Sequence, residues 1–423
     1  MPTESRSASG WSEQRVRELL RDHDFPYQRI ELPYGLATPG TDRSATASMI
    51  FPDDMSGKTV LDVGCKYGYF CFEALRRGAA RAVGLDVDPD SVRKAALLAD
   101  CLGVDAAFRL LDVERDSIGE RYDYVLCLNL LHHLKNPLAA LDKLIGVTRE
   151  RLILEVAALG RKDRRKVKIP WLVAGLLNRL PIVLVGRNGT TGRRSTQKFF
   201  ITSSAIENLL LYQRHMFARV DTYPSEGKDQ RYVSIAHRRR IGRLVVVGGP
   251  VSSGKTTLVE RLTAGELPEV AARARIGDPA GWTRISAGWL PELTEPAIDR
   301  LLLHYDFLRP YLASAKTHDR DEALDVLETA ERLTFVTIWT PPERLRRQLL
   351  ASEIEPKTRL GVYRGKSRML KIQRDYASPA RIREHYRQWF DYARTKSDDH
   401  VVVELSDPVR LYTIDEWERM VER

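Results

Sequence analysis

Short apolar runs recur along residues 57–160, and a stretch with helical periodicity separates most of them from the next. Runs of this length, rich in Val, Leu and Ile, are typical of strands that are buried on both faces. The alternation predicts an α/β domain with a doubly wound parallel sheet and a ligand at the carboxyl ends of its strands. The predicted strands cover residues 59–63, 81–85, 107–111, 124–128 and 149–155, and the predicted helices cover residues 70–77 and 89–102.

A second set of apolar runs begins near residue 243 and alternates with helical stretches in the same way. We therefore predict two three-layer αβα domains in tandem. The residues between the two sets, HRRRIGR at 237–243, are predicted to form a short basic linker. The predicted parts are an N-terminal arm over residues 1–56, a first domain over residues 57–238 and a second domain over residues 243–423.

The last part of the first domain is less regular. A basic cluster precedes an apolar stretch at residues 171–180, which we interpret as a helix packed on its own domain. The alternatives are a helix lying on a membrane surface and a lid over the acceptor site. The segment SSAIENLLLYQR predicts a helix capped by Ser203 or Ser204. Residues 217–223 and 231–237 then predict a closing β-hairpin.

The amino-acid composition indicates which partners and which cellular location to expect. The 423 residues carry a formal net charge of +10, which favours anionic partners or reflects an Arg-rich proteome. The four cysteines lack the spacing of a metal site and predict reduced, buried thiols. The first residues show no apolar signal segment, and no apolar run is long enough to span a membrane. We therefore expect a cytoplasmic protein, with the inner face of the membrane as a further option.

Residues 243–257 combine an apolar strand, a Gly-rich loop and the start of a helix. The sequence RLVVVGGPVSSGKTT fits strand–G-x-x-x-x-G-K-T–helix, with Gly249 and Gly254 as its fixed glycines. Glycines let the backbone wrap a polyphosphate, Lys255 reaches the terminal phosphates, and the Thr256 hydroxyl can hold Mg²⁺. The pattern predicts a site for ATP or another nucleoside triphosphate; the alternative is a turn that binds nothing. The loop also contributes Ser252, Ser253 and Thr257.

Two later segments resemble parts of P-loop kinases. The run LLLHYD at 301–306 resembles their second signature, so Asp306 is a candidate Mg²⁺ or water ligand or the base for an acceptor hydroxyl; the alternative is that Asp306 caps a turn. The stretch TPPERLRR at 340–347 resembles the segment before the lid of nucleoside, nucleotide and gluconate-type kinases. This resemblance implies that a basic lid stabilises the transferring phosphoryl group; a solvated charged face is the alternative. The lid arginines would be Arg359, Arg364 and Arg368.

The first predicted strand also ends in a nucleoside-binding turn. Asp62, Gly64 and Gly68 have the spacing D-x-G-x-x-x-G. Asp86 ends the next predicted strand, about 20 positions further on, where an acid accepts hydrogen bonds from ribose hydroxyls. A dinucleotide-binding dehydrogenase is the structural alternative.

The segments VLDVGCKYGYF, VGLDVDP, LLDVE and YDYVLCLNLLHHL together resemble the successive motifs of class I S-adenosylmethionine-dependent methyltransferases. The resemblance covers residues 56–160, with a continuation to 237. Residues 57–79 are similar to the branch that contains tRNA wobble-uridine methyltransferases and enzymes of surface-polysaccharide clusters. One departure is Lys66, at a position that is often glycine. The resemblance implies S-adenosylmethionine as cofactor, with Asp62, Gly64 and Gly68 at its methionine, Asp86 at its ribose, Asp112 at its adenine and Asn129 beside its sulfonium. Cys65 and Val87 are further candidates for binding this cofactor.

Two histidines follow Asn129 and are candidates for the base in a methyl transfer to oxygen. Imidazole accepts protons near neutral pH, so His133 is the first candidate and His132 the second. The alternative is that either histidine is structural.

Three functions fit these observations. The first is a bifunctional methyltransferase and ATP-dependent kinase that modifies a common small-molecule or glycan acceptor, for example by capping a surface polymer. The second is an RNA uridine methyltransferase with an NTPase helper, although we find no recognisable RNA-binding module. The third is a methyltransferase with a nucleotide-binding regulatory or sulfotransferase-like domain. The sequence does not determine the oligomeric state.

Overall fold

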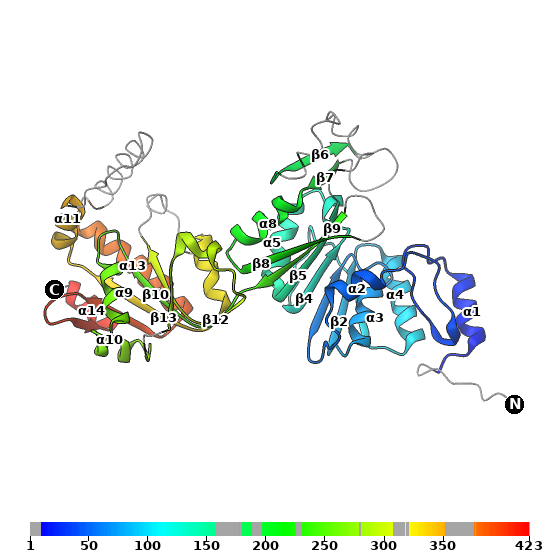
Figure 1. The fold of residues 1–423 in the computed structure, drawn as a ribbon, viewed down its shortest axis with the longest axis horizontal. Coiled ribbons are helices and arrows are strands. Elements are labelled where there is room, and N and C mark those ends of the chain that lie inside the picture. The colour runs from blue at the N-terminus through cyan, green and yellow to red at the C-terminus, as the bar shows by residue number, and fades with distance from the viewer. Residues whose placement is uncertain are drawn as a thin grey trace. The chain divides into compact units, whose positions relative to one another are not determined.

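The computed structural model describes residues 10–157, 159, 177, 180–187, 197–225, 231–278, 281–307, 318, 321–351, 376 and 378–422. The chain divides into two compact units, each with its own sheet. The first unit comprises Met1–Tyr212 and Arg219–Arg238, and the second comprises Gln213–Ala218 and Arg239–Arg423. Figure 1 shows both sheets with their helices.

The first unit alternates strands and helices as the apolar pattern predicts. Its sheet has the order β3-β2-β1-β4-β5-β9-β8, with parallel pairing from β3 to β5 and antiparallel pairing of β9 to β5. Its elements are α1 (Glu13–Asp22), η1 (Pro33–Gly35), α2 (Ser44–Ile50), β1 (Thr59–Val63), α3 (Tyr69–Arg76), β2 (Arg81–Asp86), α4 (Pro89–Leu102), β3 (Ala106–Leu110), β4 (Tyr122–Leu128), η2 (Leu131–His133), α5 (Pro137–Val147), β5 (Thr148–Ala157), β6 (Val183–Arg187), β7 (Gln197–Ile201), α8 (Ser203–Tyr212), β8 (Phe217–Pro224) and β9 (Arg231–Arg238).

The order of the strands determines where a ligand can bind in the first unit. The chain runs outward from β1 to β3 and then returns to β4 on the other side of β1. Ligands of open α/β sheets bind at such a reversal point, beyond the carboxyl ends of the strands. The predicted α/β, Rossmann-like architecture of this part of the chain is confirmed.

The second unit has a sheet of order β11-β12-β10-β13-β14-β15, parallel except for the antiparallel edge strand β15. One face packs on α9 and α10 through Leu258, Leu262 and Val270. The other face packs on α13 and α14 through Trp389 and Trp417. The elements are β10 (Arg240–Gly249), α9 (Lys255–Thr263), α10 (Pro268–Arg273), β11 (Thr283–Ser286), η3 (Ala287–Glu292), β12 (Ala297–Asp306), η5 (Glu322–Thr329), β13 (Ala330–Trp339), α11 (Pro342–Ala351), α13 (Pro379–Lys396), β14 (His400–Glu404), β15 (Arg410–Tyr412) and α14 (Ile414–Glu422).

The division between the two units falls within the basic segment 237–243, between Arg238 and Arg239. Strand β9 continues to Arg238, and β10 begins at Arg240. The side chains of Arg238 and Arg239 are buried because each guanidinium donates to backbone carbonyls, Arg238 to Thr148 and Arg239 to Leu290. Arg238 and Arg239 therefore act as buried hydrogen-bond donors where β9 ends and β10 begins.

One expectation about local structure was wrong, and one helix was not foreseen. The cap of α8 is Thr202, whose hydroxyl accepts from the N–H of Ala205, and Ser203 is already the first helical residue. The helix α2 was not predicted, because its short sequence SATASMI lacks a clear amphipathic period.

Some predicted residues lie outside the described part of the chain. These are the lid arginines Arg359, Arg364 and Arg368 and most of the apolar stretch at 171–180. Among the described residues, no helix is both long enough and apolar enough to cross a membrane.

Candidate functional sites

The turn after β1 has the backbone conformation of a ligand cradle. Gly64 and Gly68 have φ of +80° and +86°, the left-handed region that glycine adopts without strain. The N–H of Gly64 donates to the carbonyl of Leu85 at 2.7 Å, so the turn is fixed to the end of β2. A Cβ on Gly64 would lie 3.1 Å from the Leu130 side chain. Only a small residue therefore fits between this turn and the loop after β4.

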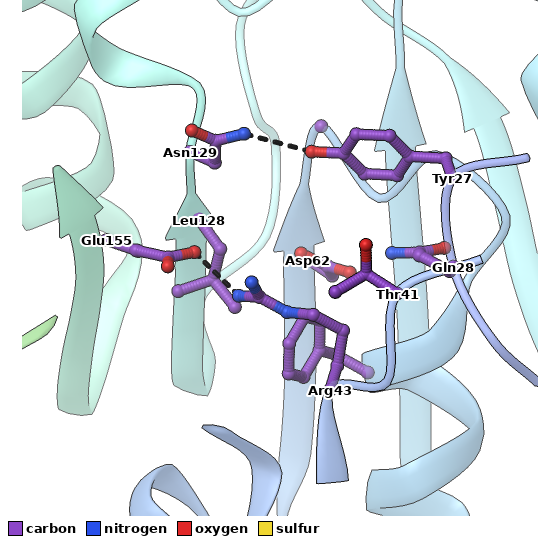
Figure 2. Close-up of a pocket in the computed structure, with 10 residues that line it drawn as sticks. Tyr27, Gln28, Thr41, Arg43, Asp62, Leu128, Asn129 and Glu155 are labelled. Atoms are coloured by element: carbon purple, nitrogen blue, oxygen red, sulfur yellow. Dashed lines mark hydrogen bonds and ion pairs between the residues drawn. The ribbon is translucent and has the colours of Figure 1, made fainter. Parts of the chain in front are cut away.

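A cavity opens beside this turn at the carboxyl ends of the central strands (Figure 2). The strands β1, β4 and β5 and the turn contribute one side, and the N-terminal arm contributes the other. The arm is therefore part of the cavity wall. The lining residues are Tyr27, Gln28, Thr41, Arg43, Asp62, Gly64, Phe70, Leu128, Asn129 and Glu155.

Asp62 is the buried acid of this cavity. Its residue exposure is 2%, and its Oδ2 has no hydrogen-bond partner within the described structure. Burial, together with the nearby charge of Asp86, raises the pKa of Asp62 to about 7. A cationic ligand group placed at Oδ2 would be stabilised by the ionised form of this carboxyl. The methionine end of S-adenosylmethionine, with its ammonium and sulfonium, fits this requirement.

Arg43 and Glu155 form a second charged pair in the cavity. The guanidinium of Arg43 lies 2.6 Å from a carboxylate oxygen of Glu155, whose side chain has no exposed surface. The hydroxyl of Ser225 donates to the other carboxylate oxygen at 2.6 Å. Burial alone would raise the pKa of Glu155, but Arg43 holds it below its ordinary value. This pair connects the arm to the end of β5.

Asn129 immediately follows β4 and lies across the cavity from the arm. Its φ is +61°, a conformation that Asn tolerates better than most residues. The side-chain amide donates to the hydroxyl of Tyr27 at 2.9 Å. The amide oxygen of Asn129 is buried without a hydrogen-bond partner in the described structure. Asn129 thus offers an acceptor beside Asp62, as expected for a residue near a sulfonium.

Asp86 lies at the end of β2, where a ribose-binding acid was expected. Its carboxylate already accepts backbone N–H groups, from Lys66 at 3.0 Å and from Asp88 at 2.9 Å. Val87 lies between Asp86 and Asp88 in the same loop. Asp86 therefore connects this loop to the turn after β1 by hydrogen bonds. To bind the ribose, its carboxylate would also have to accept hydrogen bonds from the ribose hydroxyls.

Two other residues that were predicted to bind the methyl donor lie near this loop or the turn. Asp112 follows β3, and its carboxylate accepts the N–H of Glu114 at 3.0 Å. Cys65 is buried in the turn, and burial raises the pKa of its thiol well above the ordinary value. Cys65 therefore offers the ligand backbone groups and apolar contact, with no thiolate.

The two candidate bases differ in their surroundings. His132 is 1% exposed, and burial lowers its pKa to about 2, which makes it a weak proton acceptor. His133 is exposed, and its ring lies 4.2 Å from that of His132. Neither histidine is among the residues lining the cavity. The geometry favours His133 over His132 for a contact with an acceptor.

In the second unit, the Gly-rich loop joins β10 to α9. Gly249 ends β10 beside Asp306, which ends β12, and Gly254 precedes α9 with φ of +95°. Ser252 also has a left-handed φ, at +61°. A Cβ on Gly249 would lie 2.5 Å from the Ser253 hydroxyl. The loop is therefore tightly wound, and glycine is required at its start.

Lys255 points back into this loop. Its ammonium donates to the carbonyls of Gly249 at 2.8 Å and Pro250 at 2.6 Å, and it lies 3.9 Å from Asp306. Burial lowers the pKa of Lys255, and Asp306 opposes this effect. The buried hydroxyl of Ser253 has no hydrogen-bond partner in the described structure, whereas Thr256 and Thr257 are exposed at the start of α9. These groups together fit a polyphosphate with its cation.

Comparison with known proteins identifies the first unit. Residues 54–168 match a family model described as a methyltransferase domain. The tRNA U34 carboxymethyltransferase of Campylobacter hominis is 34% identical over 92 residues, which are 22% of this chain and 32% of that protein. The ubiquinone biosynthesis O-methyltransferase of Alkalilimnicola ehrlichii is 25% identical over 190 residues, covering 39% of this chain and 76% of that protein. The ribosomal protein L11 methyltransferase of Edwardsiella ictaluri is 37% identical over 93 residues, covering 22% and 30%.

Solved structures also resemble the chain. The N-terminal domain of EvdMO1 with S-adenosylhomocysteine bound aligns with a TM-score of 0.43 and 15% identity, covering 55% of this chain and 100% of that one. The magnesium protoporphyrin IX methyltransferase of Synechocystis PCC 6803 aligns with a TM-score of 0.32 and 22% identity, covering 44% and 75%.

The first unit contains a class I S-adenosylmethionine-dependent methyltransferase domain. The matched segment spans about a third of the tRNA-modifying relative. The match therefore identifies the domain, whereas the acceptor of the whole chain is a separate question.

Sequence reasoning missed the contribution of the arm. Tyr27, Gln28, Thr41 and Arg43 line the cavity, yet they come from a Pro- and Gly-punctuated segment without a motif. The one available signal was Glu155, a charged residue at the end of the strand predicted over residues 149–155; the observed β5 continues to Ala157. A buried carboxylate requires a partner, but nothing in the sequence indicates that the partner is Arg43.

Proposed function

We propose that the first unit transfers the methyl group of S-adenosylmethionine and that the second unit uses a nucleoside triphosphate to phosphorylate the same acceptor. The cavity beside Asp62 carries the first part of this proposal. It combines a buried, unpartnered carboxylate oxygen, a glycine turn and the acceptor oxygen of Asn129 at the carboxyl ends of β1 and β4. This is the chemistry that a cationic, nucleoside-linked methyl donor requires.

The residues around the donor would divide its binding. Asp62 and Asn129 would contact its cationic end, Asp86 its ribose and Asp112 its adenine, while Gly64 gives the backbone room for close approach. The bound donor supplies an electrophilic methyl group. The exposed imidazole of His133 would accept the proton of an acceptor hydroxyl.

The loop around Lys255 carries the second part of the proposal. In the absence of a ligand, backbone carbonyls hold the Lys255 ammonium inside the loop. Phosphate oxygens would replace these carbonyls, the Ser253 hydroxyl and the N–H groups at the start of α9 would donate to them, and Thr256 and Asp306 would hold Mg²⁺. The pairing of Gly249 with Asp306 at the ends of β10 and β12 supports this proposed role of Asp306.

We propose a hydroxyl-bearing acceptor, such as the end of a surface glycan. The presence of both sites in one chain supports a common acceptor that undergoes two successive modifications. The alternative acceptor is RNA, which is favoured by the name of one relative that matches the first unit. In a further alternative, the nucleotide at Lys255 only regulates the methyltransferase.

Labelled donor and labelled ATP distinguish these possibilities. The full chain is incubated with S-adenosylmethionine carrying a radioactive methyl group, or with γ-labelled ATP, and with either oligosaccharides or total tRNA. The proposal predicts that both labels enter saccharide and that ribonuclease has no effect. Methyl label in tRNA alone would contradict the common glycan acceptor. Lys255→Ala serves as the control, since it should prevent phosphate labelling without weakening donor binding.

A further inference from the structure

The turn after β1 contains a residue in a conformation that its side chain disfavours. Lys66 has φ of +52°, although it is not a glycine. In the left-handed region, the Cβ of an L-residue crowds the neighbouring carbonyl oxygen, which costs free energy. The surrounding structure must therefore hold the turn in this shape.

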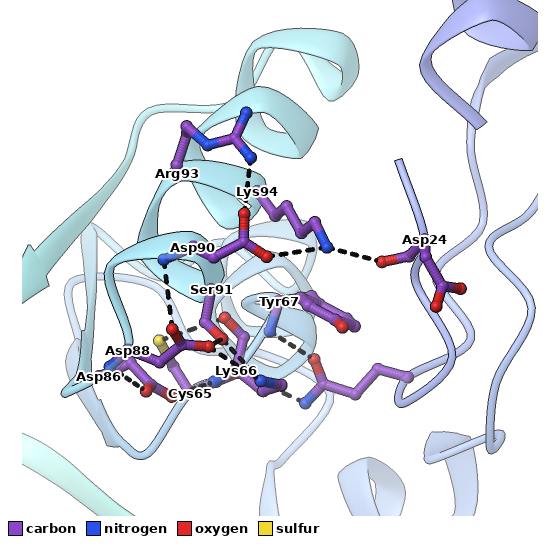
Figure 3. Close-up of polar contacts among 11 residues, drawn as sticks. Asp24, Cys65, Lys66, Tyr67, Asp86, Asp88, Asp90, Ser91, Arg93 and Lys94 are labelled. Carbon is purple, nitrogen blue, oxygen red and sulfur yellow. Dashed lines mark hydrogen bonds and ion pairs between the residues drawn. The ribbon is translucent and has the colours of Figure 1, made fainter. Parts of the chain in front are cut away.

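Contacts from β2 and α4 provide part of this support (Figure 3). The N–H of Lys66 donates to the carboxylate of Asp86 at 3.0 Å. The ammonium of Lys66 donates to the Ser91 hydroxyl at 2.7 Å and to the Asp88 carboxylate at 3.3 Å. These contacts hold the N–H and the side chain of Lys66. The groups that flank them are the carbonyl of Cys65, which also accepts the N–H of Gly68 at 2.9 Å, and the N–H of Tyr67.

Gln28 of the N-terminal arm binds both of these flanking groups. Its amide oxygen accepts the N–H of Tyr67 at 3.0 Å, and its amide nitrogen donates to the carbonyl of Cys65 at 3.4 Å. Gln28 is 4% exposed, so water does not compete for these bonds. A single side-chain amide thus spans Lys66, and only Gln or Asn can both donate and accept in this way.

The arm holds Gln28 in place by several independent contacts. The Thr38 hydroxyl donates to the carbonyl of Gln28 at 2.6 Å. The ring of Phe25 packs edge-on against Tyr67 at 5.4 Å between centroids, and the ammonium of Lys94 donates to the carbonyl of Asp24 at 2.9 Å. The residues just before Gln28 are therefore anchored to the turn and to α4, and Thr38 fixes the backbone of Gln28 within the arm.

We propose that Gln28 is a positioning residue for the methyl donor and that the arm contributes to donor affinity as part of the donor site. This inference rests on the proposed donor site in the first unit. Gln28 holds the left-handed conformation of Lys66, and this conformation directs the backbone of the turn toward the ligand. Without Gln28 the turn relaxes, and the donor must restore the conformation at the expense of its affinity.

The test combines Gln28→Ala with two substitutions at Lys66 and measures S-adenosylhomocysteine affinity by calorimetry. In the wild-type background, loss of the two buried hydrogen bonds should weaken binding about tenfold. Lys66→Gly relieves the disfavoured conformation, so Gln28→Ala should cost less than about threefold in that background. Lys66→Ala removes the same ammonium but keeps a Cβ, so the tenfold loss should persist. Gln14→Ala, on the exposed face of α1, is the matched control.

Three results would overturn the inference. Gln28→Ala with unchanged affinity would show that the arm is an inert cover. Equal rescue by Lys66→Ala and Lys66→Gly would show that the Lys66 ammonium matters and the backbone conformation does not. No rescue by Lys66→Gly would show that Gln28 acts through other contacts. If Gln28→Ala does not fold, Gln28→Glu keeps the acceptor for Tyr67 and removes the donor for Cys65, and the same backgrounds apply. Wild-type protein that binds no S-adenosylhomocysteine would instead refute the proposed function.

Discussion

Binding of the methyl donor should release a proton from Asp62. Burial and the charge of Asp86 raise the pKa of this carboxyl to about 7, so the empty cavity holds it largely protonated below pH 7. A donor with a sulfonium and an ammonium favours the ionised form. Its binding therefore lowers the pKa of Asp62 and expels the proton.

The magnitude follows from the size of the shift. At pH 6, one unit below the raised pKa, about nine-tenths of the Asp62 carboxyls carry a proton, so binding releases about 0.9 proton. Protonation of Asp62 should accordingly weaken donor binding about tenfold at pH 6 relative to the ionised carboxyl. Because the ligand binds the deprotonated form, Asp62 makes the affinity rise with pH until the α-amino group of the donor, with an ordinary pKa of about 7.7–8.0, begins to lose its own proton.

Calorimetry in buffers with different ionisation enthalpies measures this release directly. S-adenosylmethionine titrated into the full chain should release about 0.9 proton at pH 6, and the part of the release that depends on Asp62 should be almost zero at pH 8.5. Asp62→Asn should abolish the release, whereas Asp105→Asn, an exposed carboxyl with the same charge change, should leave it intact. Proton uptake at pH 6, or a release that survives Asp62→Asn, would refute the assignment of Asp62 to the cationic end of the donor.

Three further experiments test other parts of the two sites. Arg43→Met leaves the Glu155 carboxylate buried and unpaired, so the free energy of unfolding in denaturant should fall by about 3–5 kcal/mol. The double variant Arg43→Met, Glu155→Gln should lose less free energy of unfolding than Arg43→Met alone. Equal losses in the single and double variants would contradict the pairing. Lys255→Ala should abolish binding of Mg²⁺-ATP in calorimetry while S-adenosylhomocysteine still binds; retained ATP binding would show that the loop is not the nucleotide site. His133→Gln should slow methyl transfer about 100-fold on the acceptor that the labelling experiment identifies, and His132→Gln should slow it less. A larger loss of rate in His132→Gln than in His133→Gln would identify His132 as the base.

The apolar pattern predicted the central elements of the first unit well, because strands buried on both faces have a simple signature. The prediction of β1 and α4 matches the observed bounds, and Asp62, Gly64 and Asp86 lie at the strand ends as expected. These residues are local in sequence, and each role follows from its position at a turn or a strand end. The same reasoning placed the Lys255 loop between β10 and α9.

The other side of the donor cavity depends on contacts between distant residues. Arg43 meets Glu155 across 112 positions, and Asn129 meets Tyr27 across 102. No periodicity or motif connects such pairs, because only the folded sheet brings them together. Nothing in the sequence indicated that Arg238 and Arg239 are buried. Their partners are backbone carbonyls of Thr148 and Leu290, which are distant in the sequence.

The most direct test of the donor site is a crystal structure of the full chain with S-adenosylhomocysteine. We predict ligand density beside Asp62 and Asn129, with both ribose hydroxyls on Asp86 and the turn at Lys66 in its present conformation. Ligand density at another place would contradict the account. So would a crystal saturated with S-adenosylhomocysteine in which the cavity holds no ligand and the hydrogen bond between Tyr27 and Asn129 is unchanged.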